Sequence, residues 1–354
     1  MVVPHSVLHR REACIADLFP QGMPRLWCPI LTHFRGPRQL DAERITRHLQ
    51  HLAPYVQGIL VPGSTGEGWE MTDDDVLELL AVVLDAVQGR GIKVLIGVLK
   101  TDIAAVLNCL DTTARWLLRH SGCSAMEEVF ASTGVVGFTV CPPCGSELGQ
   151  EAIAAALTQV LERGLPTALY QLPQVTQNEM SPDTVRQLAA QFPNFYLLKD
   201  TSGRDRIAES AVDLNGVFLV RGAEGDYARW PKAAGGPYDG FLLSTANTLA
   251  APLSEILRLL DVRNPEEARE LSRRVSCLVE QCFAAASSCP AGNPFTNANK
   301  ALDHVLTYGA AALEHEPPWL YSGVRLPHSL IAAVAAIVHD QADWLVRFQH
   351  EEKP

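Results

Sequence analysis

The sequence predicts an α/β protein, a (β/α)8 TIM barrel followed by a C-terminal helical appendage. Three observations support this prediction: eight short apolar segments between residues 25 and 247, amphipathic segments between most of them, and no G-x-G-x-x-G motif after the first segment. Short apolar runs rich in β-branched residues are typical of strands buried on both faces, and sequential βαβ units close into a barrel. The main alternative, an open doubly wound sheet, usually carries that glycine motif.

The eight expected strands share a short apolar run that ends in glycine, proline or small polar residues. They lie at 25–34, 58–67, 93–99, 137–143, 167–173, 195–200, 217–222 and 239–247. The expected helices between them include 41–54, 73–87, 150–164 and 181–193. Thr72 precedes three aspartates and Ser181 precedes a proline. Both are therefore expected to be N-caps, since acidic residues and proline favour the first turn.

Three regions are expected along the chain. Residues 1–24 form an N-terminal extension, 25–262 form the barrel, and 263–354 form a C-terminal helical region without convincing strands. A helical insertion is expected near 121–134, where the connection between two strands is long.

Composition narrows the class of protein. A net charge of −11 argues against a nucleic-acid or anionic-membrane surface, because both need a basic patch. The N-terminus lacks a continuous apolar signal segment, and the apolar helical run 330–338 is about half of the ~20 residues that a membrane span needs. Nine cysteines without regular spacing indicate free thiols. We expect a cytoplasmic protein with neither nucleic acid nor membrane as a partner.

The candidate nucleophile is Lys199, which ends an apolar strand where this fold places its active sites. Strand alternation would put Phe195, Leu197 and Lys199 on one face, pointing into the barrel. Burying an ammonium costs several kcal/mol unless it is paired or loses its proton. Burial thus favours the neutral amine that Schiff-base formation requires. An imine with a 2-keto acid can then act as an electron sink.

Two further groups lie at expected strand ends. Tyr170 can shuttle protons, and the turn "GSTGE" (63–67) offers hydroxyls and backbone N–H groups to a carboxylate. A lysine, a tyrosine and a carboxylate clamp suffice for class I aldolase or dehydratase chemistry. We therefore expect no cofactor and no metal.

These motifs resemble those of the dihydrodipicolinate synthase / N-acetylneuraminate lyase superfamily. The similar segments are "GSTGE", "YQLP" (170–173), "LLKDTSG" (197–203) and "GFLLSTAN" (240–247), and the resemblance covers roughly residues 25–325. It implies that Lys199 forms the Schiff base and that Tyr170 is the acid/base group. It also implies that Ser64 and Thr65 hold the keto-acid carboxylate, and that the chain forms a homo-oligomer, a tetramer or a dimer.

The chain departs from the family pattern at the substrate tail. Dihydrodipicolinate synthases carry an arginine where Val175 stands, and a tyrosine pair where Pro143 and Cys144 stand, so that activity is disfavoured. The possible tail pocket comprises Cys144, Val175, Gly222, Glu224 and Ser244. Ser244 and Glu224 favour a polyhydroxylated tail, whereas Val175 and Pro143 favour an apolar or aromatic one.

The resulting hypothesis is a lyase that acts on pyruvate or a 2-keto-3-deoxy sugar acid by aldolase-type cleavage or formation of a C–C bond. Alternatives are a 2-keto-3-deoxy sugar acid dehydratase with the same lysine, and a non-catalytic binding or regulatory relative. Lys199 could instead be a strand-end lysine that reaches solvent, Tyr170 a core aromatic, and residues 63–67 a plain turn.

Redox or metal chemistry finds less support. The C-x-x-C at 141–144 lacks a second Cys/His pair at metal spacing, and the eleven histidines are dispersed. His33 is expected to be a loop residue rather than a ligand.

Overall fold

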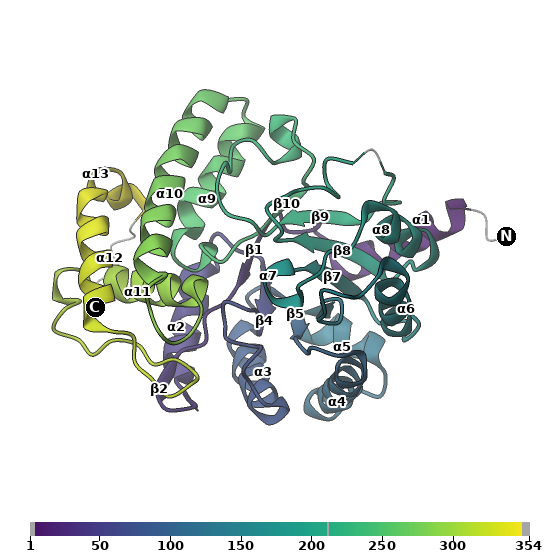
Figure 1. Cartoon of the computed structure of the whole chain (residues 1–354). Coiled ribbons are helices and arrows are strands. Elements are labelled where there is room, and N and C mark those ends of the chain that lie inside the picture. The colour runs from purple at the N-terminus through teal and green to yellow at the C-terminus, as the bar shows by residue number, and fades with distance from the viewer. Residues whose placement is uncertain (1–3, 211, 349–354) are drawn as a thin grey trace.

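The protein is described by a computed structural model covering residues 4–210 and 212–348. Eight parallel strands form a closed barrel in the order β1-β4-β5-β6-β7-β8-β9-β10, with β10 paired back to β1 (Figure 1). The strands are β1 (Leu26–Pro29), β4 (Gly58–Val61), β5 (Lys93–Val98), β6 (Val135–Val140), β7 (Thr167–Gln171), β8 (Phe195–Asp200), β9 (Phe218–Arg221) and β10 (Gly240–Leu242). The predicted barrel with its C-terminal helices is confirmed. Each strand falls where a strand was expected, except that β6 begins two residues earlier.

Helices connect most of the strands and cover the outside of the barrel. They are α2 (Ala42–Leu52), α3 (Asp73–Val87), α4 (Ile103–Ser121), α5 (Met126–Thr133), α6 (Gln150–Leu161), α7 (Pro173–Thr176), α8 (Pro182–Gln191) and α9 (Ala246–Asp261). Thr72 caps α3 by accepting a hydrogen bond from the Asp75 amide, and Ser181 caps α8 through the Thr184 amide. Both predicted N-caps are confirmed. A two-stranded hairpin of β2 (Phe34–Gly36) and β3 (Gln39–Leu40) follows β1.

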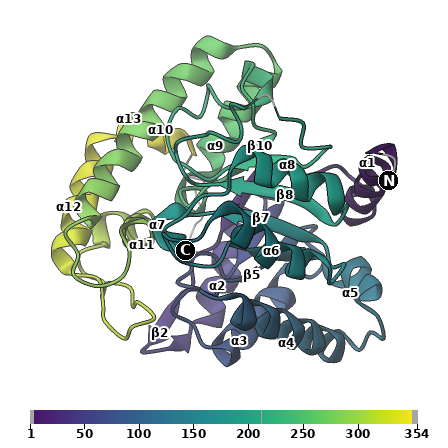
Figure 2. The same cartoon turned by 45° about the vertical axis from the view of Figure 1, so that its right-hand side comes forward.

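The C-terminal helices pack on one side of the barrel. They are α10 (Pro265–Ala286), α11 (Pro294–Tyr308), α12 (His328–Asp340) and α13 (Ala342–Leu345), and α10 contacts α9, α11 and α12 (Figures 1 and 2). No single helix among the described residues is long and apolar enough to cross a membrane. The helix α12 and the segment 342–348 reach the necessary length and hydropathy only when they are taken together, and the two are bent by 70° relative to each other.

The N-terminal helix α1 (Pro4–Leu18) lies on the opposite side, against the start of the strands (Figures 1 and 2). Leu18 and Phe19 pack on Trp27 and Tyr196 at the base of the barrel interior. The buried guanidinium of Arg11 donates hydrogen bonds to the carbonyl oxygens of Ala189, Phe192, Phe195 and Asn215. These bonds satisfy a buried charge and hold α1 beneath the strands.

A register shift in β8 corrects one expectation about its faces. The β7–β8 pairing runs from Thr167↔Phe195 directly to Ala168↔Leu197, so Tyr196 is an extra residue. Side chains in a strand alternate between its two faces, and an extra residue shifts this alternation, so residues on either side of it no longer follow one pattern. Leu197 therefore faces the barrel interior, whereas Phe195 packs in the outer core between strands and helices. The prediction that Phe195 shares a face with Leu197 is wrong.

Candidate active site

Strand pairing brings Lys199 and Tyr170 together. The two residues are register partners on the neighbouring strands β8 and β7. Both side chains are buried, Lys199 at 4% and Tyr170 at 2% exposure, and Nζ of Lys199 lies 4.0 Å from the centre of the Tyr170 ring. The amine and the phenol thus occupy one site at the carboxyl ends of the strands, where this fold performs chemistry.

Lys199 differs from Lys300, the other buried lysine of the described residues. Lys300 is paired with the Glu67 carboxylate and also donates a 2.8 Å hydrogen bond to the Trp319 carbonyl oxygen. Lys199 makes no ion pair with a described residue, and its Nζ atom lies over the face of the Tyr170 ring. Its amino group is therefore not engaged by a carboxylate and is available to a substrate.

Gly222 provides the space that Lys199 occupies. It follows β9, which pairs with β8. A Cβ atom at position 222 would lie 2.8 Å from Cε of Lys199 and 2.2 Å from Oγ1 of Thr201. Contacts this short force a shift of the neighbouring groups, so only glycine leaves the lysine where it is.

The loop 63–67 after β4 offers a carboxylate clamp. The Trp69 indole N–H donates a 2.9 Å hydrogen bond to Oγ of Ser64, which leaves the Ser64 hydroxyl proton free to donate elsewhere. Thr65 is buried. The backbone carbonyl oxygens of Ser64 and Thr65 accept hydrogen bonds from Oγ1 of Thr296, at 3.4 and 3.0 Å. The loop thus keeps its donors for a ligand while α11 holds its backbone.

Glu67 belongs to this loop but not to the clamp. Its side chain is fully buried against Lys300 of α11 and accepts a 2.8 Å hydrogen bond from the Tyr321 amide. Because Lys300 and Thr296 both lie on α11, the C-terminal helices position the loop.

An apolar cluster surrounds Tyr170. Leu99, Cys141, Tyr170 and Leu172 form a buried cluster, and Trp69 and Val175 pack against it. Burial raises the pKa of the Cys141 thiol far above its usual range, so it remains a protonated, unreactive group. Cys144 is half-buried, and its amide donates to the Thr101 carbonyl oxygen at 2.8 Å. No described cysteine forms a disulfide.

A polar cluster follows the strands β9 and β10 and involves Glu224 and Ser244. Oε1 of Glu224 accepts hydrogen bonds from the Ser244 hydroxyl (2.7 Å) and the Thr245 amide (3.2 Å). Oε2 accepts from the Thr245 hydroxyl (2.6 Å) and the Tyr227 hydroxyl (2.9 Å). Because the Ser244 hydroxyl donates its proton to Glu224, its oxygen lone pairs can accept a hydrogen bond from a substrate hydroxyl.

The structure thus brings Lys199, Tyr170 and Gly222 together, joins Glu224 to Ser244, and places Val175 beside Tyr170. Sequence reasoning missed Trp69, Thr296, Thr245 and Tyr227. Trp69 carries a local signal, an aromatic residue two positions after a glycine-rich turn, and Thr245 stands next to Ser244. Thr296 carries none, because its partners lie far away in the chain.

The chain is similar to proteins of known sequence and structure. A family model described as "Dihydrodipicolinate synthetase family" matches residues 23–293. The 4-hydroxy-tetrahydrodipicolinate synthase 1 of Streptomyces coelicolor is 29% identical over 288 residues, which cover 81% of this chain and 85% of that protein.

Two solved structures share the fold. One is a prophage protein of the dihydrodipicolinic acid synthase family from E. coli K12 in complex with pyruvate, with a TM-score of 0.72, 18% identity and coverage of 90% of this chain and 99% of that one. The other is a variant of the Sulfolobus solfataricus 2-keto-3-deoxygluconate aldolase, with a TM-score of 0.69, 17% identity and coverage of 92% and 98%.

Proposed function

This chain belongs to the dihydrodipicolinate synthetase family, a family of class I lyases, and we propose that it forms a Schiff base between Lys199 and a 2-keto acid. The proposed substrate is a 2-keto-3-deoxy sugar acid, cleaved to pyruvate and an aldehyde or formed from them. The observation that carries this proposal is the buried Lys199, which has no carboxylate partner among the described residues and lies against the face of Tyr170.

The proposed reaction begins when the Lys199 amine adds to the substrate's keto carbon. Tyr170 protonates the oxygen, which departs as water and leaves a protonated imine. The imine accepts the electron pair of the bond between the third and fourth carbons as that bond breaks. The proton of the hydroxyl on the fourth carbon passes to Tyr170 as the aldehyde forms. Protonation of the third carbon and hydrolysis of the imine then release pyruvate and the free lysine.

The proposed role of the loop 63–67 is to hold the substrate carboxylate. The Ser64 hydroxyl has its proton free because Trp69 occupies one of its lone pairs. We assign Ser64 and Thr65, together with their amides, to the carboxylate. Neutral donors suit this task, since they bind the carboxylate without placing a second positive charge beside the protonated imine.

The polar cluster supports a sugar-acid tail. Ser244, oriented by Glu224, offers an acceptor to tail hydroxyls, whereas Val175 belongs to the apolar cluster around Tyr170. Val175 cannot clamp a second carboxylate as an arginine would. We therefore propose that the physiological reaction is not dihydrodipicolinate synthesis, although the curated relatives carry that name. A dehydratase would use the same imine but expel water, so product analysis separates the two reactions.

The test is borohydride trapping with pyruvate, followed by mass spectrometry of the tryptic peptides. We expect a reduced adduct on the 187–204 peptide, with none on the peptide that contains Lys300. The matched variant Lys199→Arg keeps a long side chain with N–H donors but no nucleophilic amine, and it should lose the adduct. A folded wild-type protein without an adduct would favour the non-catalytic alternative. Incubation with 2-keto-3-deoxy sugar acids, scored for pyruvate release against water loss, then identifies the reaction.

Three expectations stay proposals. They are the limits of the three regions of the chain, assembly into a dimer or tetramer, and a cytoplasmic location.

A further inference from the structure

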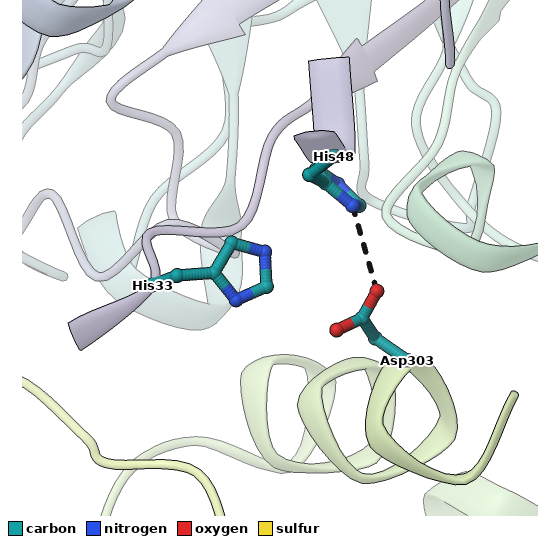
Figure 3. A group of neighbouring side chains, drawn as sticks. All are labelled: His33, His48 and Asp303. Carbon is teal, nitrogen blue, oxygen red and sulfur yellow. Dashed lines mark ion pairs between the residues drawn. The ribbon is translucent and has the colours of Figure 1, made fainter. Parts of the chain in front are cut away.

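Three potential metal ligands converge between the barrel and the C-terminal helices (Figure 3). His33 comes from the loop between β1 and β2, His48 from α2, and Asp303 from α11. Their ligand atoms all lie within 4.8 Å of one another. Both histidines are buried, and the side chain of Asp303 is 13% exposed.

His33 presents an unpaired nitrogen to this cluster. The residue is 7% exposed, and its Nε2 atom is buried without a hydrogen-bond partner among the described residues. Buried polar atoms in folded proteins are almost always satisfied, so an unsatisfied one needs an explanation.

The hydrogen bonds of Asn247 determine which nitrogen of His48 carries the proton. The Asn247 amide nitrogen donates to the carbonyl oxygens of Pro29 and Ser244, so its oxygen must be an acceptor. That oxygen accepts from the Leu31 amide at 2.8 Å and from Nε2 of His48 at 2.9 Å. In its neutral form, His48 therefore carries its proton on Nε2, which donates to Asn247, and has its lone pair on Nδ1.

Nδ1 of His48 lies 3.5 Å from Oδ1 of Asp303 (dashed line, Figure 3). A lone pair and a carboxylate oxygen this close require a positive charge between them or on the histidine. Ligands of tetrahedral zinc are separated by about 3.4 Å, given metal–nitrogen distances of about 2.1 Å. The spacing of this pair fits such an ion, and a side-chain rotation of His33 would complete the set.

Arg44 orients the Asp303 carboxylate. It donates to Oδ2 of Asp303 at 2.6 Å and leaves Oδ1 toward the histidines. Outer partners of this kind, Asn247 on the imidazole and Arg44 on the carboxylate, are what metal ligands usually have.

A cavity of about 180 Å³ reaches the cluster, with His33 and Asp303 in its lining. It offers an entry path and room for a water molecule as a fourth ligand. The lining also contains Arg44, which is paired with Asp303, and Lys300, which is paired with Glu67. Lys300 thus has a carboxylate of its own, whereas Arg44 would share Asp303 with the ion.

We propose that His33, His48 and Asp303 bind one divalent transition-metal ion of the zinc class. Two imidazoles favour such an ion over calcium or magnesium, which prefer oxygen ligands. The ion would join α11 to α2 and to the loop after β1, and α11 in turn holds the loop 63–67. The site is structural, and it departs from the expectation of no metal because its ligands come from three distant segments.

The test is titration of the chelator-treated full chain with Zn²⁺ and Co²⁺. We expect one Zn²⁺ per chain by calorimetry, tetrahedral absorption bands with Co²⁺, and a higher Tm when Zn²⁺ is present. His33→Ala should weaken Zn²⁺ binding at least about 10-fold and abolish the Tm shift. The exposed His328→Ala is the matched control and should bind as wild type.

Folding of the variants is checked by imine trapping with pyruvate, which His33→Ala should retain because its Nε2 has no partner to lose. Asp303→Asn, which keeps the side-chain shape, should also lose Zn²⁺ binding. The proposal is overturned if wild type binds no stoichiometric Zn²⁺, or if His33→Ala binds it as tightly as wild type. Either result would leave the 3.5 Å ion pair of His48 with Asp303 as the account of the cluster.

Discussion

Replacing Gly222 with alanine tests whether the position of Lys199 depends on an empty space beside it. The new methyl group would lie 2.8 Å from Cε of Lys199 and 2.2 Å from Oγ1 of Thr201. Overpacking of this kind costs about 1–3 kcal/mol of stability. The lysine end is flexible and is expected to move, and a displacement of about 1 Å costs roughly 10²-fold in rate. Gly222→Ala should therefore trap pyruvate about 100-fold more slowly than wild type.

The double variant Gly222→Ala/Thr201→Ala separates the two contacts. Removing Oγ1 of Thr201, a buried atom without a hydrogen-bond partner in residues 4–210 and 212–348, relieves the shorter contact and should recover most of the lost stability. The contact with Lys199 persists, so trapping should stay slow. Gly149→Ala is the control, because its Cβ would meet nothing within 4 Å.

The assays are denaturant unfolding for stability and single-turnover borohydride trapping for imine formation. Wild-type trapping rates in Gly222→Ala, or their full recovery in the double variant, would refute the argument that this glycine places Lys199.

Three further predictions follow from the hydrogen bonds and ion pairs around the site. Trp69→Phe removes the indole bond to Ser64, and the loss of about 0.5–1.5 kcal/mol should raise KM for the keto acid about 2- to 10-fold; an unchanged KM in steady-state kinetics would argue against Ser64 as a carboxylate ligand. Lys300→Met leaves Glu67 buried and unpaired and should cost about 3–5 kcal/mol in urea unfolding, whereas the double variant Glu67→Gln/Lys300→Met should cost less than the sum of the single changes. Although partial burial acts in the opposite direction, hydrogen bonds from Thr72, Tyr321 and Arg38 lower the pKa of Asp75 to about 2. Because this folded-state pKa lies below the unfolded value of about 3.9, the stabilisation is present above pH ~4 and is lost as pH falls toward 2. The urea midpoint of wild type should therefore drop more between pH 6 and pH 3 than that of Asp75→Asn.

The closeness of Lys199 and Tyr170 follows from features that are visible in the sequence. Both residues end consecutive apolar segments, and consecutive strands of a parallel barrel are neighbours with their carboxyl ends at one edge. The faces within a strand are less predictable. The extra residue Tyr196 turns Phe195 outward, and nothing local distinguishes that bulge from regular alternation.

The amino-acid sequence alone determined the barrel, its strand segments, two helix caps and the strand ends where Lys199 and Tyr170 lie. These features depend on patterns within a few residues, such as apolar periodicity and capping chemistry, that act on the local backbone. Only the tertiary structure decided which distant groups meet: Arg11 beneath the strands, Thr296 and Lys300 on the loop 63–67, and Asp303 beside two histidines. Such contacts arise where helices pack on the barrel, and packing joins residues whose separation along the chain leaves no local trace.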